Sequence, residues 1–455
     1  MVYDLLVLGG GPGGYISAER AGRAGLSTLL IEERELGGVC LNEGCIPTKT
    51  FLHSAKLYDC AKNESMKYGV ICENVRLDHA FVVERKRRVT SVLVAGVNAA
   101  MKESGVKVIK GRGIIQGQSR GEFKVEVNGE VYLARRLIVA TGSRPIIPPI
   151  PGVQEGIAEG RVLFSREMLE LSEVPEQLTV IGAGVIGLEL AAYYNDAGSK
   201  VTVLELLDKI AGATDTEISS ALQRSCERKG IVFELGAQMK QIGQDAAVFA
   251  RGGSEYALPY RKILLSVGRK AVTTGFGLET LGVYQEYGCV VINDRCQTNI
   301  ANVYAVGDCT GRSMLAHTAY RQGEVAVNHI LGIPDRMSYN AIPAVIYTSP
   351  EVGAVGVTED AARQKGLDIR TVKLPLQFSG RYLAENEGGC GICKLIFDRN
   401  KDTLVGAHML GNPASEFILA CGIMIEKEMT PQEIKRFVFP HPTVCEIIRE
   451  AVFRL

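Results

Sequence analysis

Two segments of the chain share one pattern of apolar, glycine and acidic positions. In the first segment, the apolar run Leu5–Leu8 leads into a string of glycines, and a helix-compatible stretch follows to about Ala24. A second strand-like segment, Ser27–Ile31, then ends at Glu32. The pattern predicts a strand, a glycine turn, a helix and a second strand, in the order typical of a dinucleotide-binding unit.

Each part of this unit has a physical task. Gly9 is expected to make the tight turn, Gly11 to let the backbone approach a pyrophosphate, and Gly14 to allow close packing of the helix against the strand. The helix N-terminus would face the phosphates, and Glu32 would accept a hydrogen bond from a ribose hydroxyl. Because all the parts occur in order, a dinucleotide site is favoured over an ordinary glycine-rich loop.

The same unit recurs later in the chain. The apolar run Leu178–Ile181 leads into Gly182, Gly184 and Gly187, and a second strand ends at Glu205. The spacing from Gly182 to Glu205 is 23 residues, the same as from the first glycine of the earlier unit to its acidic residue. Two complete units indicate two dinucleotides, which we expect to be a tightly held FAD and an exchanging nicotinamide cofactor.

The end of the second unit predicts which nicotinamide cofactor binds. Glu205 would repel a 2′-phosphate, and residues 206–209 supply no arginine cluster that could bind one. NAD is therefore preferred over NADP.

Cys40 and Cys45 follow the first unit closely. A disulfide across so short a loop adds little chain-entropy stabilisation, so redox chemistry or metal binding explains the pair better than stapling does. Zinc is the weaker alternative, because no second Cys/His pair accompanies the two cysteines. The pair predicts a dithiol–disulfide couple beside a bound cofactor. We expect most of the twelve cysteines to be small buried hydrophobes.

Length and composition limit the remaining possibilities. A chain of 455 residues is expected to form two to four domains, and 46% hydrophobic with 22% charged residues is typical of a globular protein. The net charge is zero, which gives no electrostatic argument for nucleic acid or an anionic membrane. The apolar runs are far shorter than a membrane span. The N-terminus enters a strand at once, so we expect no signal segment and a cytoplasmic enzyme of prokaryotic type.

Several motifs resemble the pyridine nucleotide–disulfide oxidoreductase family and, within it, the branch of dihydrolipoyl dehydrogenases. These motifs are the Cys40–Cys45 segment with Pro47 and Lys49, Val139–Ser143, Val303–Asp308, Leu315–Ala319 and His441–Glu446. They cover essentially the whole chain in the family's order. Two positions depart from the pattern: Phe439 stands where members often carry a histidine, and Cys445 lies inside the last motif.

The resemblance implies an α/β fold with two Rossmann-like FAD- and NAD-binding domains and an α+β C-terminal dimerisation domain. The implied domains are residues 1–145 (first FAD part, with the disulfide), 146–270 (NAD), 271–340 (completing the FAD site) and 341–455 (interface). It also implies a homodimer, because in this family the acid–base histidine reaches the disulfide of the other subunit.

The implied reaction is oxidation of protein-bound dihydrolipoamide to lipoamide, through the disulfide and FAD, with hydride passed to NAD. The implied partner is the lipoyl domain of a 2-oxoacid dehydrogenase complex or the glycine cleavage H protein. His441 would be the acid–base and Glu446 would orient it, while Cys40 would be attacked by substrate and Cys45 would become a thiolate against the flavin. Cys45 lies just before Pro47 and is expected at a helix N-terminus, where the dipole favours thiolate.

With the two glycine units, the resemblance gives the following expected site residues. The catalytic residues are Cys40, Cys45, Lys49, His441 and Glu446; the FAD-binding residues are Gly9, Gly11, Gly14, Glu32, Lys49, Thr141, Gly142, Asp308 and Ala319; the NAD-binding residues are Gly182, Gly184, Gly187, Glu189 and Glu205. Lys49 is expected near flavin N5, paired with Glu189.

Three alternative functions remain. Glutathione reduction usually goes with NADPH, which Glu205 disfavours. Mercuric reductases usually end in a cysteine pair, which this chain lacks. A structural subunit of a multienzyme complex would not need the complete set of catalytic residues.

Other reactive residues have simpler interpretations. The histidines other than His441 are expected to be packed or surface residues; these are His53, His79, His317, His329 and His408. Cys390 and Cys393 form a C-x-x-C sequence that could be a second redox pair, but a structural role is favoured because no helix starts there. The basic run Arg85–Arg88 is expected to be a solvated helix face, with an acidic partner as the alternative.

Overall fold

The computed structural model describes all 455 residues. The chain divides into two compact units, and each combines separate segments of sequence. The first unit contains residues 1–50, 83–146 and 268–338, and the second contains residues 51–82, 147–267 and 339–455. Both units are therefore discontinuous in sequence, and the long helices α3 (Cys45–Asp59) and α4 (His79–Glu103) each begin in one unit and end in the other.

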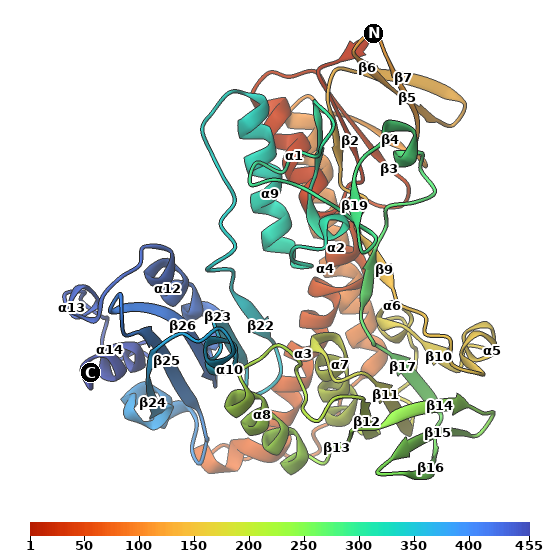
Figure 1. Cartoon of the computed structure of the whole chain (residues 1–455). Coiled ribbons are helices and arrows are strands. Elements are labelled where there is room, and N and C mark those ends of the chain that lie inside the picture. Colours follow the sequence, from red (N-terminus) through yellow and green to blue (C-terminus); the bar gives the residue numbers. More distant parts are fainter. The chain divides into compact units, whose positions relative to one another are not determined.

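The centre of the first unit is a five-stranded parallel sheet in the order β21-β8-β2-β3-β4. Its strands are β2 (Leu5–Leu8), β3 (Thr28–Glu32), β4 (Lys107–Lys110), β8 (Leu137–Val139) and β21 (Val303–Ala305). The continuous apolar run of β2 is buried at every position, as expected for a parallel strand covered on both faces. Helices α1 (Pro12–Arg23) and α9 (Ala316–Ile330) lie side by side in this unit (Figure 1).

Two smaller sheets complete the first unit. The first is a four-stranded sheet in the order β1-β7-β6-β5, formed by Val2–Tyr3, Glu130–Ala134, Glu122–Val127 and Ile114–Ser119. The second is an antiparallel pair of β9 (Ser143–Pro145) and β18 (Arg269–Ala271), which lie on the two segments that connect the units.

The second unit repeats the parallel-sheet plan. Its sheet has the order β10-β17-β11-β12-β13, with strands Val162–Leu163, Lys262–Leu265, Gln177–Ile181, Lys200–Glu205 and Val232–Leu235. Helix α7 (Val185–Asp196) follows β11, and helix α8 (Thr216–Arg228) follows β12. A three-stranded antiparallel sheet extends this part, with strands Gln238–Ile242 (β14), Ala246–Arg251 (β15) and Ser254–Pro259 (β16).

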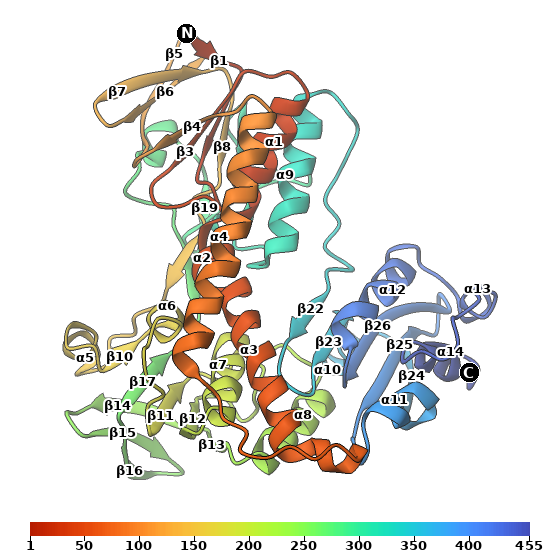
Figure 2. The same cartoon turned by 180° about the vertical axis from the view of Figure 1, so that it is seen from behind.

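The C-terminal part of the second unit is an antiparallel sheet with helices. The sheet order is β22-β23-β26-β25-β24, formed by Ala344–Ile346, Val352–Gly356, Thr403–Leu410, Ile392–Asp398 and Ile369–Pro375. The helices are α10 (Glu359–Gln364), α11 (Gly380–Glu385), α12 (Ala414–Glu426), α13 (Pro431–Ile434) and α14 (Glu446–Val452). Figure 2 shows α12 beside β23 and β26, which it contacts. The hydrophobic core of the C-terminal part includes Phe397, Met409 and Ile418.

The predicted fold class is confirmed: two doubly wound α/β parts and an α+β C-terminal part are present. None of the helices combines the length and apolar character that crossing a bilayer requires.

Two predictions about particular residues were wrong in part. The run Arg85–Arg88 lies in α4, but the side chain of Lys86 is only 2% exposed. Successive residues of a helix turn by about 100°, so four consecutive side chains cannot all face solvent when one side of the helix is covered. Only half of the ten free cysteines are buried, namely Cys226, Cys296, Cys309, Cys393 and Cys421.

Candidate active site

The first glycine loop joins β2 to α1 at the carboxyl end of the parallel sheet. Gly9 has a φ of +106°, and a Cβ at this position would lie 2.2 Å from the carbonyl oxygen of Ala140. A Cβ at Gly14 would lie 1.8 Å from the carbonyl oxygen of Gly9. The turn and the close packing of α1 therefore both require glycine.

Gly11 differs from these two glycines, because the fold itself does not require glycine there. A Cβ at Gly11 would meet only the Cα of Gly38, at 3.8 Å, so the chain's own packing leaves room for a side chain there. The free space lies at the N-cap of α1, where backbone N–H groups point outward. This arrangement fits a phosphate group that must approach the backbone closely, and it fits the pyrophosphate of FAD.

The second glycine loop, between β11 and α7, repeats this geometry. Gly182 has a φ of +101°, and a Cβ there would lie 2.6 Å from the carbonyl oxygen of Ser266. A Cβ at Gly187 would lie 2.1 Å from the carbonyl oxygen of Gly182. Gly184, the N-cap of α7, has nothing within 4 Å of its Cβ position. The open position therefore again lies at the helix start, and it fits a second dinucleotide.

The acidic residue at the end of each second strand is held in the same way. Glu32 accepts hydrogen bonds from the backbone N–H groups of Gly10 at 2.6 Å and Arg34 at 2.7 Å. Glu205 accepts from the backbone N–H groups of Ala183 at 2.6 Å and Leu207 at 2.9 Å. Each carboxylate is thereby fixed beside its glycine loop, the position from which it can bind a ribose hydroxyl.

The other expected FAD residues meet in the first unit, because they follow neighbouring parallel strands. Thr141 and Gly142 follow β8, and Asp308 follows β21 in a short 3-10 helix (Gly307–Thr310). The hydroxyl of Thr141 donates to the carbonyl of Val272 at 2.6 Å. Ala319 is buried on α9, and a Cβ at Gly13 on α1 would lie 3.4 Å from its carbonyl oxygen.

A group that sequence reasoning missed surrounds Asp308. Its carboxylate accepts a hydrogen bond from the hydroxyl of Ser143 at 2.5 Å, and Arg269 donates to the hydroxyl and the carbonyl oxygen of Ser143, at 2.8 Å each. Burial lowers the pKa of Arg269, and the carboxylates of Asp308 and Glu43 oppose that shift. Arg269 directly follows a glycine at the return into the first unit, but its partners are remote in sequence, so only the fold shows them.

The cysteine pair is carried by two consecutive helices of the first unit. Cys40 lies in α2 (Gly38–Glu43), Cys45 is the first residue of α3, and the two form a disulfide with a Cα–Cα distance of 4.7 Å. The amide of Asn42 donates to the carbonyls of Leu36 and Gly38, which holds the start of α2 in place.

The helix that carries Cys40 packs directly against the first glycine loop. The backbone N–H of Gly37 donates to the carbonyl of Gly10 at 2.8 Å, and a Cβ at Gly38 would lie 2.6 Å from the Cα of Gly11. The disulfide therefore begins two residues from a backbone contact with the nucleotide loop. The predicted position of Cys45 at a helix N-terminus is confirmed, and there the helix dipole favours a thiolate.

Lys49 and Glu189 lie in different units of the chain. Lys49 lies one helical turn after Cys45 in α3 and is half-buried. Glu189 lies in α7, is only 2% exposed, and accepts a hydrogen bond from the backbone N–H of Tyr347 at 3.0 Å. Their pairing stays a prediction.

His441 and Glu446 form a hydrogen-bonded pair in the second unit. The Nδ1 atom of His441 lies 2.8 Å from Oε1 of Glu446, and the backbone N–H of Thr443 donates to the other carboxylate oxygen at 2.8 Å. The Thr443 N–H, together with the His441 ring, lowers the pKa of Glu446 below its usual value. Since an ionised carboxylate only accepts hydrogen bonds, Nδ1 must be the donor, and Nε2 is left free to accept a proton.

The rest of the C-terminal motif shows how His441 is presented. The side chain of His441 is 78% exposed, so its free nitrogen faces outward from this unit. Glu446 is the first residue of α14, where the helix N-terminus also favours a carboxylate. Cys445 contacts the hydroxyl of Thr443 at 3.2 Å, and Phe439 packs against the C-terminal core. Neither departure from the family pattern disturbs the pair.

Two models of known protein families match the sequence of this chain. Residues 3–323 match the model of the pyridine nucleotide-disulphide oxidoreductases, and residues 342–452 match the dimerisation domain of the same family. The chain therefore belongs to the pyridine nucleotide-disulphide oxidoreductase family.

Individual relatives cover almost the whole chain. The dihydrolipoyl dehydrogenase of Bacillus subtilis is 38% identical over 99% of this chain and 97% of its own length, and the mitochondrial dihydrolipoyl dehydrogenase of Pisum sativum is 36% identical over 98% and 90%. Among solved structures, LpdA from Mycobacterium tuberculosis has a TM-score of 0.88 with 26% identity over 99% of both chains. The HOCl-induced flavoprotein disulfide reductase RclA from Escherichia coli has a TM-score of 0.86 with 25% identity over 99% of both chains.

Proposed function

We propose that this protein is a NAD-dependent dihydrolipoyl dehydrogenase. It would oxidise protein-bound dihydrolipoamide to lipoamide through the Cys40–Cys45 disulfide. The observation that carries the proposal is the disulfide itself, whose Cys40 helix packs on the first nucleotide loop in a chain 38% identical to a dihydrolipoyl dehydrogenase. FAD, when bound, would accept the electron pair from the reduced cysteines and pass it to NAD as hydride.

The chain's own residues would divide the thiol chemistry among them. A dithiol becomes a nucleophile when it loses a proton, and Nε2 of His441 is the free nitrogen that can take it. Glu446 would hold the ring in the required tautomer. The substrate sulfur would then attack Cys40, and Cys45 would leave as a thiolate at the start of α3.

The cofactor assignments follow from the two loops. The first unit would hold FAD with Gly9, Gly11, Gly14 and Glu32, completed by Thr141, Gly142, Asp308, Ala319 and Lys49. The second would hold NAD with Gly182, Gly184, Gly187, Glu189 and Glu205. We keep the four predicted domains, 1–145, 146–270, 271–340 and 341–455, as the parts that carry these roles.

We also propose a homodimer in which His441 serves the disulfide of the other subunit. The base must come within about 3 Å of the thiol that it deprotonates, directly or through one water. The dimerisation-domain match over residues 342–452 supports the proposal. The partner would be a lipoyl domain or the glycine cleavage H protein, and the cytoplasmic location expected from the sequence stays a prediction.

Sulfur-specific spectroscopy tests the catalytic proposal. Limited reduction with dihydrolipoamide should give a long-wavelength charge-transfer band that arises from the Cys45 thiolate beside FAD. Cys40→Ser should show this band without reductant, because Cys45 then has no disulfide partner, whereas Cys45→Ser should never show it. A band in Cys45→Ser, or none in Cys40→Ser, would reverse or refute the assignment of the two sulfurs.

Subunit mixing tests the shared site. Cys45→Ser and His441→Ala should each be inactive alone. When the two are unfolded together and reassembled, each mixed dimer should regain about half of the wild-type activity, because one of its two sites carries neither change. Verified mixed dimers that stay inactive would show that each site is built within one chain.

A further inference from the structure

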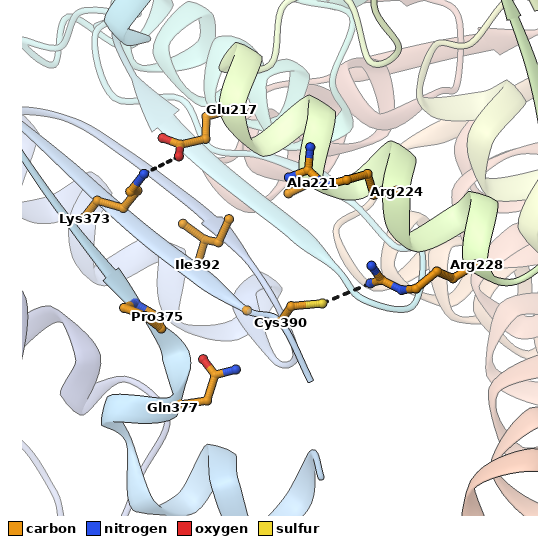
Figure 3. Close-up of a pocket in the computed structure, with 10 residues that line it drawn as sticks. Glu217, Ala221, Arg224, Arg228, Lys373, Pro375, Gln377, Cys390 and Ile392 are labelled. Atoms are coloured by element: carbon orange, nitrogen blue, oxygen red, sulfur yellow. Dashed lines mark hydrogen bonds and ion pairs between the residues drawn. The ribbon is translucent and has the colours of Figure 1, made fainter. Parts of the chain in front are cut away.

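A surface cavity of about 300 Å³ lies in the second unit, and none of the residues assigned to catalysis lines it (Figure 3). One wall is a stripe of α8 made by Glu217, Ala221, Arg224 and Arg228, whose spacings of four, three and four residues place them on one helix face. The opposite wall is formed by Lys373 and Pro375 at the end of β24 and by Gln377 just after it. Residues Cys390–Ile392, which lead into β25, complete this wall. The nucleotide loops and the C-terminal histidine do not line it.

The cavity is positively charged. Lys373 pairs with Glu217, but neither Arg224 nor Arg228 has a carboxylate within ion-pair distance. Three cations and one carboxylate give the lining a net charge of +2. Two unpaired guanidinium groups one helical turn apart are suited to bind carboxylates, since each can donate two parallel hydrogen bonds.

The exposed thiol of Cys390 lies beside these positively charged groups. Nη2 of Arg228 donates a hydrogen bond to the sulfur of Cys390 at 3.0 Å (Figure 3). Cys60 and Cys72 are also exposed, but their sulfurs have no such partner. Cys393 is fully buried in the C-terminal core, and burial raises its pKa well above the usual value. The burial of Cys393 favours a structural role for it, so the proposal below uses Cys390 alone.

Gln377 completes the lining without facing a ligand. Its side-chain nitrogen donates to the carbonyl of Gly389, and its oxygen, Oε1, is buried out of reach of the cavity. The groups available to a ligand are therefore the carboxylate-binding arginines and the thiol.

We propose that this cavity is a site of reversible S-thiolation, at which Cys390 reacts with low-molecular-weight peptide or amino-acid disulfides that carry carboxylates. The sulfur of Cys390 attacks one sulfur of the disulfide RSSR, a new S–S bond forms, and the other half leaves as RSH with the proton of the Cys390 thiol. Cys390 is oxidised to the mixed disulfide and one RS group is reduced to thiol. The inference does not depend on the proposed function.

Competition between thiols in one chain tests the proposal. The oxidised holoenzyme, whose Cys40 and Cys45 are protected as a disulfide, would be treated with glutathione disulfide, which carries carboxylates, or with the cationic disulfide cystamine. Peptide mass mapping would give initial rates at Cys390, Cys60 and Cys72. The ratio of the anionic to the cationic reagent should be at least ~10-fold higher at Cys390 than at the other two thiols, and salt should reduce the difference. Equal ratios at the three thiols would overturn the proposal.

Two sets of variants test whether the charge of the arginines, and not only the exposure of Cys390, determines its reaction rate. The double variant Arg224→Gln/Arg228→Gln should lower the rate of Cys390 with glutathione disulfide about 10-fold, while the rates of Cys60 and Cys72 stay unchanged. Arg228→Lys keeps the charge and should stay within about twofold of wild type. Dihydrolipoamide turnover should be unchanged in both and serves as the folding control. An unchanged Cys390 rate in the double variant would contradict the assigned role of the arginines.

Discussion

The second residue of the helix that follows the first glycine loop is buried, whereas the second residue of the helix that follows the second loop is exposed. Gly13 and Gly14 at the start of α1 are buried, and a Cβ at Gly13 would lie 2.8 Å from the side chain of Val306. In α7, Ile186 at the position equivalent to Gly13 is 37% exposed and Val185 before it is 43% exposed, whereas Gly187, the equivalent of Gly14, is buried.

The two units hold their acidic residues alike but differ in what packs against their glycine loops. In the first unit, α9 packs on α1 so closely that a Cβ at Gly323 would lie 2.6 Å from the hydroxyl of Ser17. The helix that bears Cys40 packs on the same loop. No corresponding element covers Gly184, which is exposed. One loop design can therefore serve a resident cofactor when it is covered and an exchanging cofactor when it is open.

The largest effect should come from placing a side chain at the third glycine of each loop. Gly14→Ala puts a Cβ 1.8 Å from a carbonyl oxygen and should abolish flavin content, because α1 can no longer pack at the end of β2. Gly187→Ala, with its contact at 2.1 Å, should retain flavin and reduction of the disulfide by dihydrolipoamide. It should lower kcat/KM for NAD by at least ~100-fold. Flavin absorbance would measure flavin content, and steady-state kinetics would measure kcat/KM for NAD. Loss of flavin in Gly187→Ala would contradict the assignment of the second loop to NAD alone.

The second-largest effect should come from replacing Glu205 or Glu32, the carboxylates that follow the glycine loops. Glu205 should make kcat/KM for NAD exceed that for NADP by at least ~100-fold, through a repelled phosphate and a lost hydrogen bond. Glu205→Ala should narrow this gap. The matched variant Glu32→Ala should weaken flavin retention and leave the choice of nicotinamide unchanged. Equal use of both nicotinamides by the wild type would contradict the assignment.

The smallest effect concerns the last residue of each helix. Arg23 ends α1 and suits the negative end of the helix dipole, whereas α7 ends at Asp196. Burial raises the pKa of Asp196 from 3.8 to about 6, and Lys229 opposes the shift. Between these values only the folded state binds the proton, so this group lowers stability as pH rises toward 6 and has a constant effect above it.

Asp196→Asn should therefore raise the free energy of unfolding near neutral pH by about 1 kcal/mol, after allowance for partial solvent exposure and the lost attraction to Lys229. The gain should shrink as the pH is lowered toward 4. Urea unfolding of the holoenzyme at several pH values would measure it, with Arg23→Gln as the control that should show no gain. A gain that grew at low pH would have the wrong sign.

The sequence could predict those features that depend on neighbouring residues. Both glycine loops, their acidic residues, the disulfide and the His441–Glu446 pair each lie within a few tens of residues, so spacing or motif reveals them. The group of Ser143, Arg269 and Asp308 could not be predicted in this way, because its members are 126 and 165 residues apart. The same holds for the buried ion pair of Lys394 with Asp215, separated by 179 residues.

A covered first loop should hold FAD permanently, while an open second loop should exchange NAD. The most direct measurement is to dialyse the purified protein with an excess of NAD, remove the free nucleotide, and identify what remains bound. The account predicts about one FAD per chain and no retained NAD. Subsequent anaerobic addition of NADH should reduce the protein and produce the long-wavelength band of the Cys45 thiolate. Loss of the flavin on dialysis together with retention of NAD would contradict the account.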